Sequence, residues 1–240
     1  MQQVHKFNKF ISNVKMHPWV SAVESTFRQH ANPEYAKQMA AYMKDNFPYL
    51  GINTPLRKSL LTEIKSQSPE PDLTQLQEVV LVLWAMNERE FQYVALYLLQ
   101  RNLSKLPPSW IPFLLQLITE KSWWDSVDTI AGSIISGIIK KHPEALETHL
   151  FNCISHNNFW INRTAIIAQL KLHQKTDVEF LTAAILPHMH SKEFFLRKAI
   201  GWSLRQYAKS NPQWVIDFVT THEDELSGLS KREALKHIKL

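Results

Sequence analysis

The chain has 240 residues, of which 45% are apolar, and it carries a formal net charge of +5 with a pI near 9.2. That length and apolar content predict a folded globular protein with a substantial core. Cys153 is the only cysteine, which excludes an intrachain disulfide and a zinc site built from cysteines. No run of about 18 uncharged apolar residues and no signal-peptide pattern occurs, so a cytoplasmic protein without membrane association is expected. The moderate positive charge commonly attends a polyanionic partner.

The start of the chain differs from the rest in its periodicity. Residues 1–15 lack a helical pattern and are expected to form an N-terminal extension, ahead of one domain over residues 16–240. The 12 prolines and 5 glycines, with no Asn-Gly or Asp-Gly hairpin signal, indicate helices that begin at proline and are joined by short turns. Almost no sheet is expected.

Two sequence positions predict the starts of early helices. Asn32-Pro33 is typical of a helix cap followed by a proline in the first turn, and it predicts a helix to about Asn46. Thr54-Pro55 predicts a second such start before a helix over residues 56–65. Arg57 and Lys58 then fall in the first turn, where cations are unfavourable beside the helix dipole. An anion bound there would relieve this conflict, but two solvated surface charges explain the pattern as well.

From Leu73 onward the helices are expected in pairs. The last of them is predicted to begin with a capping box from Ser230 to Glu233. The predicted pairs are 73–86 with 88–102, 108–120 with 123–141, 143–156 with 158–173, 178–190 with 192–210, and 212–223 with 230–239.

A weak internal repeat supports this pairing. The triplet Arg-x-Ala begins at Arg163, Arg197 and Arg232, spaced by 34 and then 35 residues, and Ala131 and Ala95 extend the series backward. A period near 35 with two helices per unit is typical of an α-solenoid, in which a small residue lets the second helix pack closely. The predicted fold is therefore all-α, a curved solenoid of HEAT-like antiparallel helix pairs whose second helices line one side.

The stretch from Ser122 to Asp128 places two tryptophans and two carboxylates near the start of an apolar helix. Trp124 and Asp128 are four residues apart and therefore share a helix face, where they could frame one small target. The alternative is a core aromatic beside a local cap or ion pair.

Several stretches together carry a resemblance to a known family. They are Ala41-Tyr42-Met43-Lys44, Leu50-Gly51-Ile52 with Thr54-Pro55, Lys121 to Asp128, Trp160 to Leu170, Lys192 to Tyr207, and Leu229 to Ile238. With these motifs the chain resembles, from about Met16 to its end, the bacterial DNA alkylation repair glycosylases built of HEAT-like repeats, the AlkD type.

The resemblance implies a monofunctional glycosylase, without cofactor or metal, that hydrolyses the N-glycosidic bond of N3- and N7-alkylated purines in duplex DNA. It implies that Asp128 is the catalytic carboxylate and that Trp124 and Trp202 are two indoles flanking the lesion nucleotide. It further implies that Arg163 is a cleft arginine near the DNA backbone and Tyr42 an aromatic side chain at the cleft edge. Such a carboxylate would stabilise the oxocarbenium-like sugar and orient water. An arginine would bind phosphate through two hydrogen bonds.

Further positions are candidates for DNA contact, although each is also explained as an ordinary solvated helix face. His188 and His190 diverge on a helix, so a metal site there is not expected. Arg197 is left out of the site because structural ion pairing explains it. The DNA-contact candidates are Thr54, Arg57, Lys58, Lys171, Arg205, Lys209, Lys231 and Arg232.

Two other functions remain open from the sequence. One is a non-catalytic HEAT-like module that binds DNA or a protein, for which a carboxylate facing a polyanion would serve no purpose. The other is a protein-interaction solenoid in which Trp124 and Trp202 are binding hot spots. The protein is expected to be a monomer.

Overall fold

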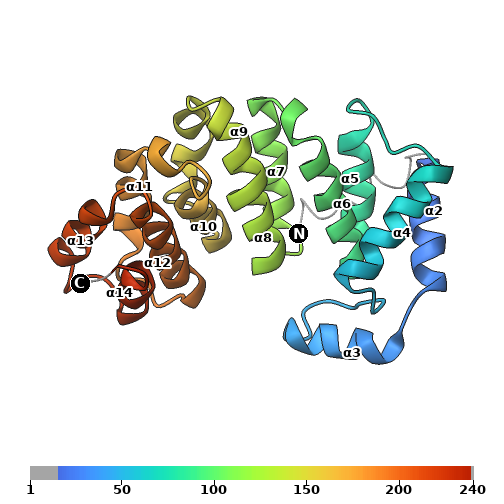
Figure 1. Ribbon diagram of the computed structural model, residues 1–240, viewed down its shortest axis with the longest axis horizontal. Helices are drawn as coiled ribbons and strands as arrows, with labels where there is room; N and C mark the ends of the chain where they lie inside the picture. Colours follow the sequence, from blue (N-terminus) through green and yellow to red (C-terminus); the bar gives the residue numbers. More distant parts are fainter. Residues whose placement is uncertain (1–15, 239–240) are drawn as a thin grey trace. The chain divides into compact units, whose positions relative to one another are not determined.

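The computed structural model describes residues 16–238, and all the regular structure in that range is helical (Figure 1). Thirteen α-helices and several short 3₁₀ or π segments occur among the described residues, without a strand, so the predicted all-α class is confirmed. The chain forms two compact units that divide between Asn102 and Leu103. The expected N-terminal extension lies outside the described residues, and a single domain over residues 16–240 remains a prediction.

The first unit contains five of these helices. α2 packs against α4, and α5 packs against α6. Their bounds are α2 Pro18–Gln29, α3 Pro33–Tyr42, α4 Thr54–Gln67, α5 Leu76–Ala85 and α6 Arg89–Arg101.

Asparagine caps begin both α3 and α4. Asn32 accepts a hydrogen bond from the Tyr35 amide, as the Asn32-Pro33 pattern predicts, although α3 ends at Tyr42 and not near residue 46. The prediction that Thr54 caps the next helix is wrong by one residue. Asn53 is the cap and accepts from the Leu56 amide at 3.0 Å, because its side-chain oxygen reaches the first turn and leaves Thr54 as the first helical residue.

The loop before α4 is held by a buried carboxylate. Glu90 in α6 is fully buried and accepts backbone hydrogen bonds from Leu50, Gly51 and Ile52 at 2.9–3.0 Å. Gly51 has a φ of +85°, and a Cβ there would lie 2.1 Å from the Asn32 carbonyl oxygen. Only glycine therefore fits this loop without strain.

The second unit begins at Leu103. Figure 1 shows α8, α10, α12 and α14 following one another along this unit, with contacts between each pair in the series. The bounds are η1 Leu103–Lys105, η2 Pro108–Trp110, α7 Ile111–Thr119, α8 Trp124–Thr129, η3 Ile130–Ile135, α9 Ser136–Lys141, η4 Leu146–Leu150, η5 Phe151–Cys153, α10 Phe159–Ile167, η6 His173–Lys175, α11 Val178–Ile185, η7 Leu186–His188, α12 Phe194–Ala208, α13 Pro212–Thr221 and α14 Gly228–Leu235.

The in-phase alanines mark the second helix of each pair, as the repeat predicts. Ala131, Ala165, Ala199 and Ala234 are at most 1% exposed, and so is Ala95 in the first unit. Their small side chains allow neighbouring helices to approach closely. The α-solenoid-like arrangement of helix pairs is therefore confirmed in the second unit.

The predicted helices over residues 143–156 and 158–173 differ from the structure. Residues 143–156 form η4 and η5 in place of one α-helix, because the Asn162 amide donates to the carbonyls of Cys153, Ile154 and His156 outside the helical pattern. The helix predicted to residue 173 ends at Ile167. The side chain of Gln169 exchanges two hydrogen bonds with the backbone of Asp177, and these bonds turn the chain toward α11.

The predicted capping box at the last helix is wrong. Ser227 caps α14 by accepting from the Ser230 amide at 3.0 Å, so Ser230 lies inside the helix. The Ser230 hydroxyl donates to the Arg197 carbonyl of α12 at 2.9 Å. Tertiary contact between α12 and α14 therefore uses the residues that the local pattern assigned to a cap.

Candidate active site

Four charged residues recur at equivalent points of successive second helices. Asp128, Arg163, Lys198 and Glu233 are each separated by 35 residues and lie on α8, α10, α12 and α14. The repeat therefore brings neighbouring charges together as two opposite-charge pairs. Asp128 pairs with Arg163, and Lys198 pairs with Glu233.

Asp128 and Arg163 form a two-point ion pair. Arg163 donates from Nε to Oδ1 at 2.7 Å and from Nη2 to Oδ2 at 2.8 Å. The Arg163 side chain is only 3% exposed, whereas that of Asp128 remains 19% exposed. The third nitrogen, Nη1, donates to the Phe195 carbonyl. A guanidinium bound in this way orients the carboxylate rigidly.

This geometry differs from the expected role of Arg163 at the DNA backbone. Each of its three side-chain nitrogens already has an acceptor within the protein, and the side chain is buried. In the structure Arg163 therefore holds Asp128, and its expected contact with the DNA backbone remains a prediction.

The ionisation of Asp128 is balanced between opposing influences. Burial raises the pKa of the Asp128 carboxyl above its ordinary value, while the hydrogen bonds and charge of Arg163 act in the opposite direction and the charge of Asp125 adds to the rise. In the observed geometry both carboxylate oxygens accept from Arg163, which is the arrangement of the ionised form.

A pocket of about 320 Å³ opens beside this ion pair. Trp124 is the first residue of α8 and lies one turn before Asp128, so the two share a face as the spacing predicts. Trp202 comes from α12. The lining residues are Trp124, Asp128, Arg163, Phe194, Phe195, Lys198, Trp202 and Arg205.

Aromatic rings pack around Phe195, which lies beside the ion pair. The ring centroid of Phe195 lies 5.3 Å from that of Trp123 and 4.7 Å from that of Trp160. The Arg163 guanidinium carbon lies 6.0 Å from the same Phe195 centroid. Phe195 therefore places one aromatic ring beside the guanidinium, and Trp123 and Trp160 pack against that ring.

Glu233 forms a second ion-pair group with Lys198 and Arg205, two cations that line the same pocket as Asp128. Glu233 binds Lys198 at 2.7 Å through Oε1 and Arg205 through Oε2. The hydrogen bond from Lys198, aided by the charges of Lys198, Arg205 and Lys236, holds the pKa of Glu233 below its ordinary value, although burial opposes this. Arg205, a candidate for DNA contact, therefore lies in the pocket with an acidic partner.

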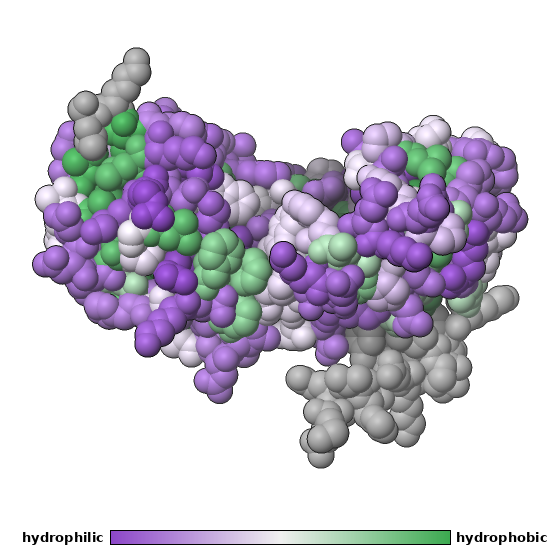
Figure 2. All heavy atoms as spheres, turned by 90° about the horizontal axis from the view of Figure 1, so that it is seen from below, coloured by the Kyte–Doolittle hydropathy of each residue, from purple (hydrophilic) through white to green (hydrophobic). Residues whose placement is uncertain are grey.

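The other candidate cations of this unit lie on the surface. Lys171, Lys209 and Arg232 are exposed. Lys231 is half-buried and donates from Nζ to the Glu223 carbonyl at 2.9 Å. Figure 2 shows that hydrophilic side chains predominate on the face it draws, with separate apolar areas between them.

The remaining candidates for DNA contact belong to the first unit. Tyr42 ends α3 and is 71% exposed. Thr54 accepts from Arg57 at 3.2 Å, and the Arg57 guanidinium lies 4.7 Å from the centroid of the Tyr93 ring. Burial lowers the pKa of Arg57, although nearby Tyr and Glu side chains oppose this. Lys58 is exposed, and an anion at this helix start remains a prediction.

Three pocket residues were missed at the sequence level: Phe194, Phe195 and Lys198. The 35-residue spacing could have found two of them. Phe194 begins α12 where Trp124 begins α8, two periods earlier, and Lys198 follows Arg163 by one period. Phe195 follows Trp160 by one period, but Trp160 was not itself a site candidate, so the spacing did not mark Phe195, whose backbone carbonyl accepts from Arg163.

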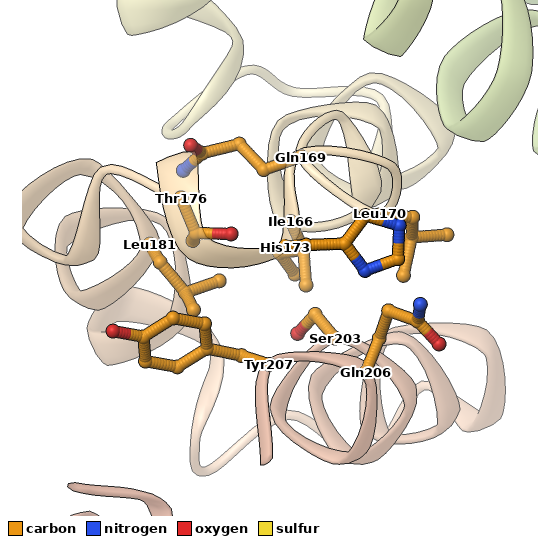
Figure 3. Close-up of a pocket in the computed structure, with 9 residues that line it drawn as sticks. All are labelled: Ile166, Gln169, Leu170, His173, Thr176, Leu181, Ser203, Gln206 and Tyr207. Atoms are coloured by element: carbon orange, nitrogen blue, oxygen red, sulfur yellow. The ribbon is translucent and has the colours of Figure 1, made fainter. Parts of the chain in front are cut away.

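A second cavity, drawn in Figure 3, lies between α10, η6, α11 and α12. Its volume of about 10 Å³ has room for one water molecule. Figure 3 shows the side chains of Gln169, His173 and Gln206 around it, and no residue of the Asp128 pocket is among its lining residues. This cavity is too small for a substrate.

The described residues contain no group of three or more His, Cys, Asp or Glu side chains arranged to hold a metal. His188 instead makes a 2.7 Å hydrogen bond with the Ile154 carbonyl, and His190 lies 3.7 Å from Glu225. Burial raises the pKa of the Cys153 thiol to about 11, which does not suit a nucleophile.

Within residues 16–238, every helix is too short or too polar to cross a membrane.

This fold and pocket are those of a helical-repeat protein whose charged and aromatic side chains meet on its second helices. Residues 23–238 match the family of DNA alkylation repair enzymes, and the chain belongs to that family. It is similar to a solved structure from Enterococcus faecalis, described as a predicted DNA alkylation repair enzyme, with a TM-score of 0.79 and 36% identity. That similarity covers 87% of this chain and 96% of the other. None of the curated proteins compared with the chain matches it.

Proposed function

We propose that the protein is a DNA glycosylase that hydrolyses the N-glycosidic bond of N3- and N7-alkylated purines in duplex DNA. Membership of the DNA alkylation repair enzyme family supports a role in the repair of alkylated DNA. The observation that carries the glycosylase assignment is the partly exposed Asp128 carboxylate, oriented by Arg163 at a pocket that also contains Trp124 and Trp202.

The chemistry of the reaction fits this set of side chains. Loss of an alkylated purine builds positive charge on the deoxyribose, while the leaving base is already cationic and requires little protonation. Asp128 would stabilise that developing charge and orient the attacking water. Only the ionised carboxylate can do so, and the paired guanidinium of Arg163 favours the ionised form.

The indoles of Trp124 and Trp202 would contact the sugar and the cationic base. An aromatic face attracts a cation by about 0.5–2 kcal/mol, depending on how far water is excluded. A polyanionic backbone then requires cations on the surrounding surface, and exposed lysines and arginines of this unit meet that requirement. We further propose that the protein acts as a cytoplasmic monomer without a metal or cofactor.

The direct test is release of free base from duplex DNA that contains a single N7-methylguanine. Purified wild-type protein in excess over DNA should release 7-methylguanine far faster than spontaneous depurination, measured by liquid chromatography with the spontaneous rate subtracted. Asp128→Asn is the matched variant because it retains the side-chain size and loses the charge. Duplex binding without base release above the spontaneous rate would overturn the glycosylase and favour a non-catalytic DNA-binding module.

A further inference from the structure

The carboxylate of Glu233 joins two cations of the pocket wall. One oxygen binds Lys198 at 2.7 Å and the other binds Arg205. The side chain of Glu233 is 13% exposed, whereas those of Lys198 and Arg205 are 38% and 22% exposed. Both cations line the same pocket as Asp128, but Glu233 does not. The acid therefore lies behind the two cations and does not face the pocket.

Close packing of two helices creates this arrangement. Lys198, Gly201 and Arg205 lie on one face of α12 at spacings of three and four residues. A Cβ at Gly201 would lie 2.5 Å from the Cβ of Glu233 and 2.8 Å from the Ser230 carbonyl oxygen. The glycine thus admits α14 between the two cations, which brings Glu233 within reach of both.

Positive charges outnumber negative charges among these ion-paired residues. Asp128 and Arg163 neutralise each other, whereas Lys198 and Arg205 share only one carboxylate, so one positive charge remains. Each cation also retains further N–H donors, because a lysine has three and an arginine has five. Arg205 additionally lines a neighbouring groove of about 340 Å³ that contains Lys209 and His237, so the cationic surface continues beyond the pocket.

We propose that Glu233 is a positioning residue that holds Lys198 and Arg205 as a two-cation clamp for the phosphate next to the lesion nucleotide. The inference rests on the proposed function for the identity of its ligand, a DNA phosphodiester. It explains how the pocket binds phosphate although Arg163 is engaged with Asp128. It also explains why an acid occurs at a surface for a polyanion, since its charge fixes two cations in place.

The test compares the effect of Glu233→Gln in the wild-type protein with its effect in a Lys198→Ala, Arg205→Ala variant. Alone, Glu233→Gln should slow single-turnover excision of N7-methylguanine about tenfold at saturating enzyme, because the cations lose their fixed positions. Binding to undamaged duplex should stay equal or become tighter, because one negative charge is removed. In a Lys198→Ala, Arg205→Ala background the same substitution should change neither quantity, because residues that act as one unit are not additive. Glu223→Gln, 71% exposed and outside the pocket, is the matched control.

The dependence of DNA binding on salt concentration tests the clamp without relying on catalysis. Lys198→Ala with Arg205→Ala should reduce the log–log salt slope for undamaged duplex by about one unit, as expected for one lost phosphate contact. An unchanged slope would overturn the clamp even in an active enzyme. Equal slowing of excision by Glu233→Gln in both backgrounds, with lower stability in urea, would show that Glu233 serves the fold alone. If wild-type protein releases no base, the proposed glycosylase fails, while the slope still decides whether the clamp exists.

Discussion

Two carboxylates of this protein occupy contrasting environments, one in each unit. Glu90 is fully buried and accepts hydrogen bonds from Leu50, Gly51 and Ile52, all from the backbone of one loop. Asp128 is bound by one guanidinium and keeps 19% of its side chain exposed. A carboxylate that is fully buried, such as Glu90, cannot reach a ligand and can only stabilise the fold. One that is bound from a single side can still face a ligand.

The largest effect is expected when Asp128 loses its partner. Arg163→Ala should lower the free energy of unfolding by about 3–5 kcal/mol, because it leaves a carboxylate without its compensating charge and orphans the Phe195 carbonyl. Arg163→Lys should cost less, since it retains the charge and loses the two-point geometry. Urea unfolding measures both. The salt slope of duplex binding should stay unchanged, and a slope reduced by one unit at unchanged stability would instead assign Arg163 to a phosphate.

Removal of the Asp128 charge should act on catalysis more than on the fold. Asp128→Asn should reduce single-turnover excision by about 10²–10³-fold, a typical cost for a lost electrostatic contribution to the transition state. Duplex binding should persist or tighten, because an anion near phosphates is unfavourable in the ground state. Wild-type excision rates in a variant with an unchanged circular dichroism spectrum would remove Asp128 from the mechanism.

The opposite result is expected for the enclosed carboxylate. Glu90→Gln should lower the free energy of unfolding by about 2 kcal/mol, because charge-assisted hydrogen bonds to the loop backbone are weakened. Excision per folded molecule should not change. Glu63→Gln, an exposed position of α4 in the same unit, is the control and should alter neither stability nor excision. A catalytic defect without lost stability would place Glu90 among the functional residues.

A smaller and more specific effect concerns pH. Since burial raises the pKa of Asp128, the ionised form should be lost at a higher pH than for an ordinary aspartate as the solution is acidified. Excision should therefore be constant above this pKa and fall tenfold per pH unit below it. The profile should be recorded as single-turnover rates, with spontaneous depurination subtracted at each pH. An acid limb at or below the ordinary aspartate range would contradict the desolvation of Asp128.

Parts of this contrast were predictable from local spacing. Trp124 and Asp128 share a helix face because they are four residues apart, and the in-phase alanines identify the second helices. Glu90 could not be recognised, since its partners are some 40 residues earlier in the chain and are backbone groups without a sequence signature. Ser230 was assigned to a cap because the local pattern permits it, but a tertiary hydrogen bond to the Arg197 carbonyl takes its hydroxyl.

The sequence by itself determined the all-α class, the 35-residue period and the helix faces, because these depend on near-neighbour spacing and on side-chain size. Only the tertiary structure decided which charges meet. Arg163 binds Asp128, and Glu233 binds both Lys198 and Arg205, because helices separated by a full period pack closely enough for these side chains to touch. Any two opposite charges attract, whatever their separation in the sequence, so the sequence does not identify the partner of a given cation. Packing in the folded chain does, because it sets the distance between the charges.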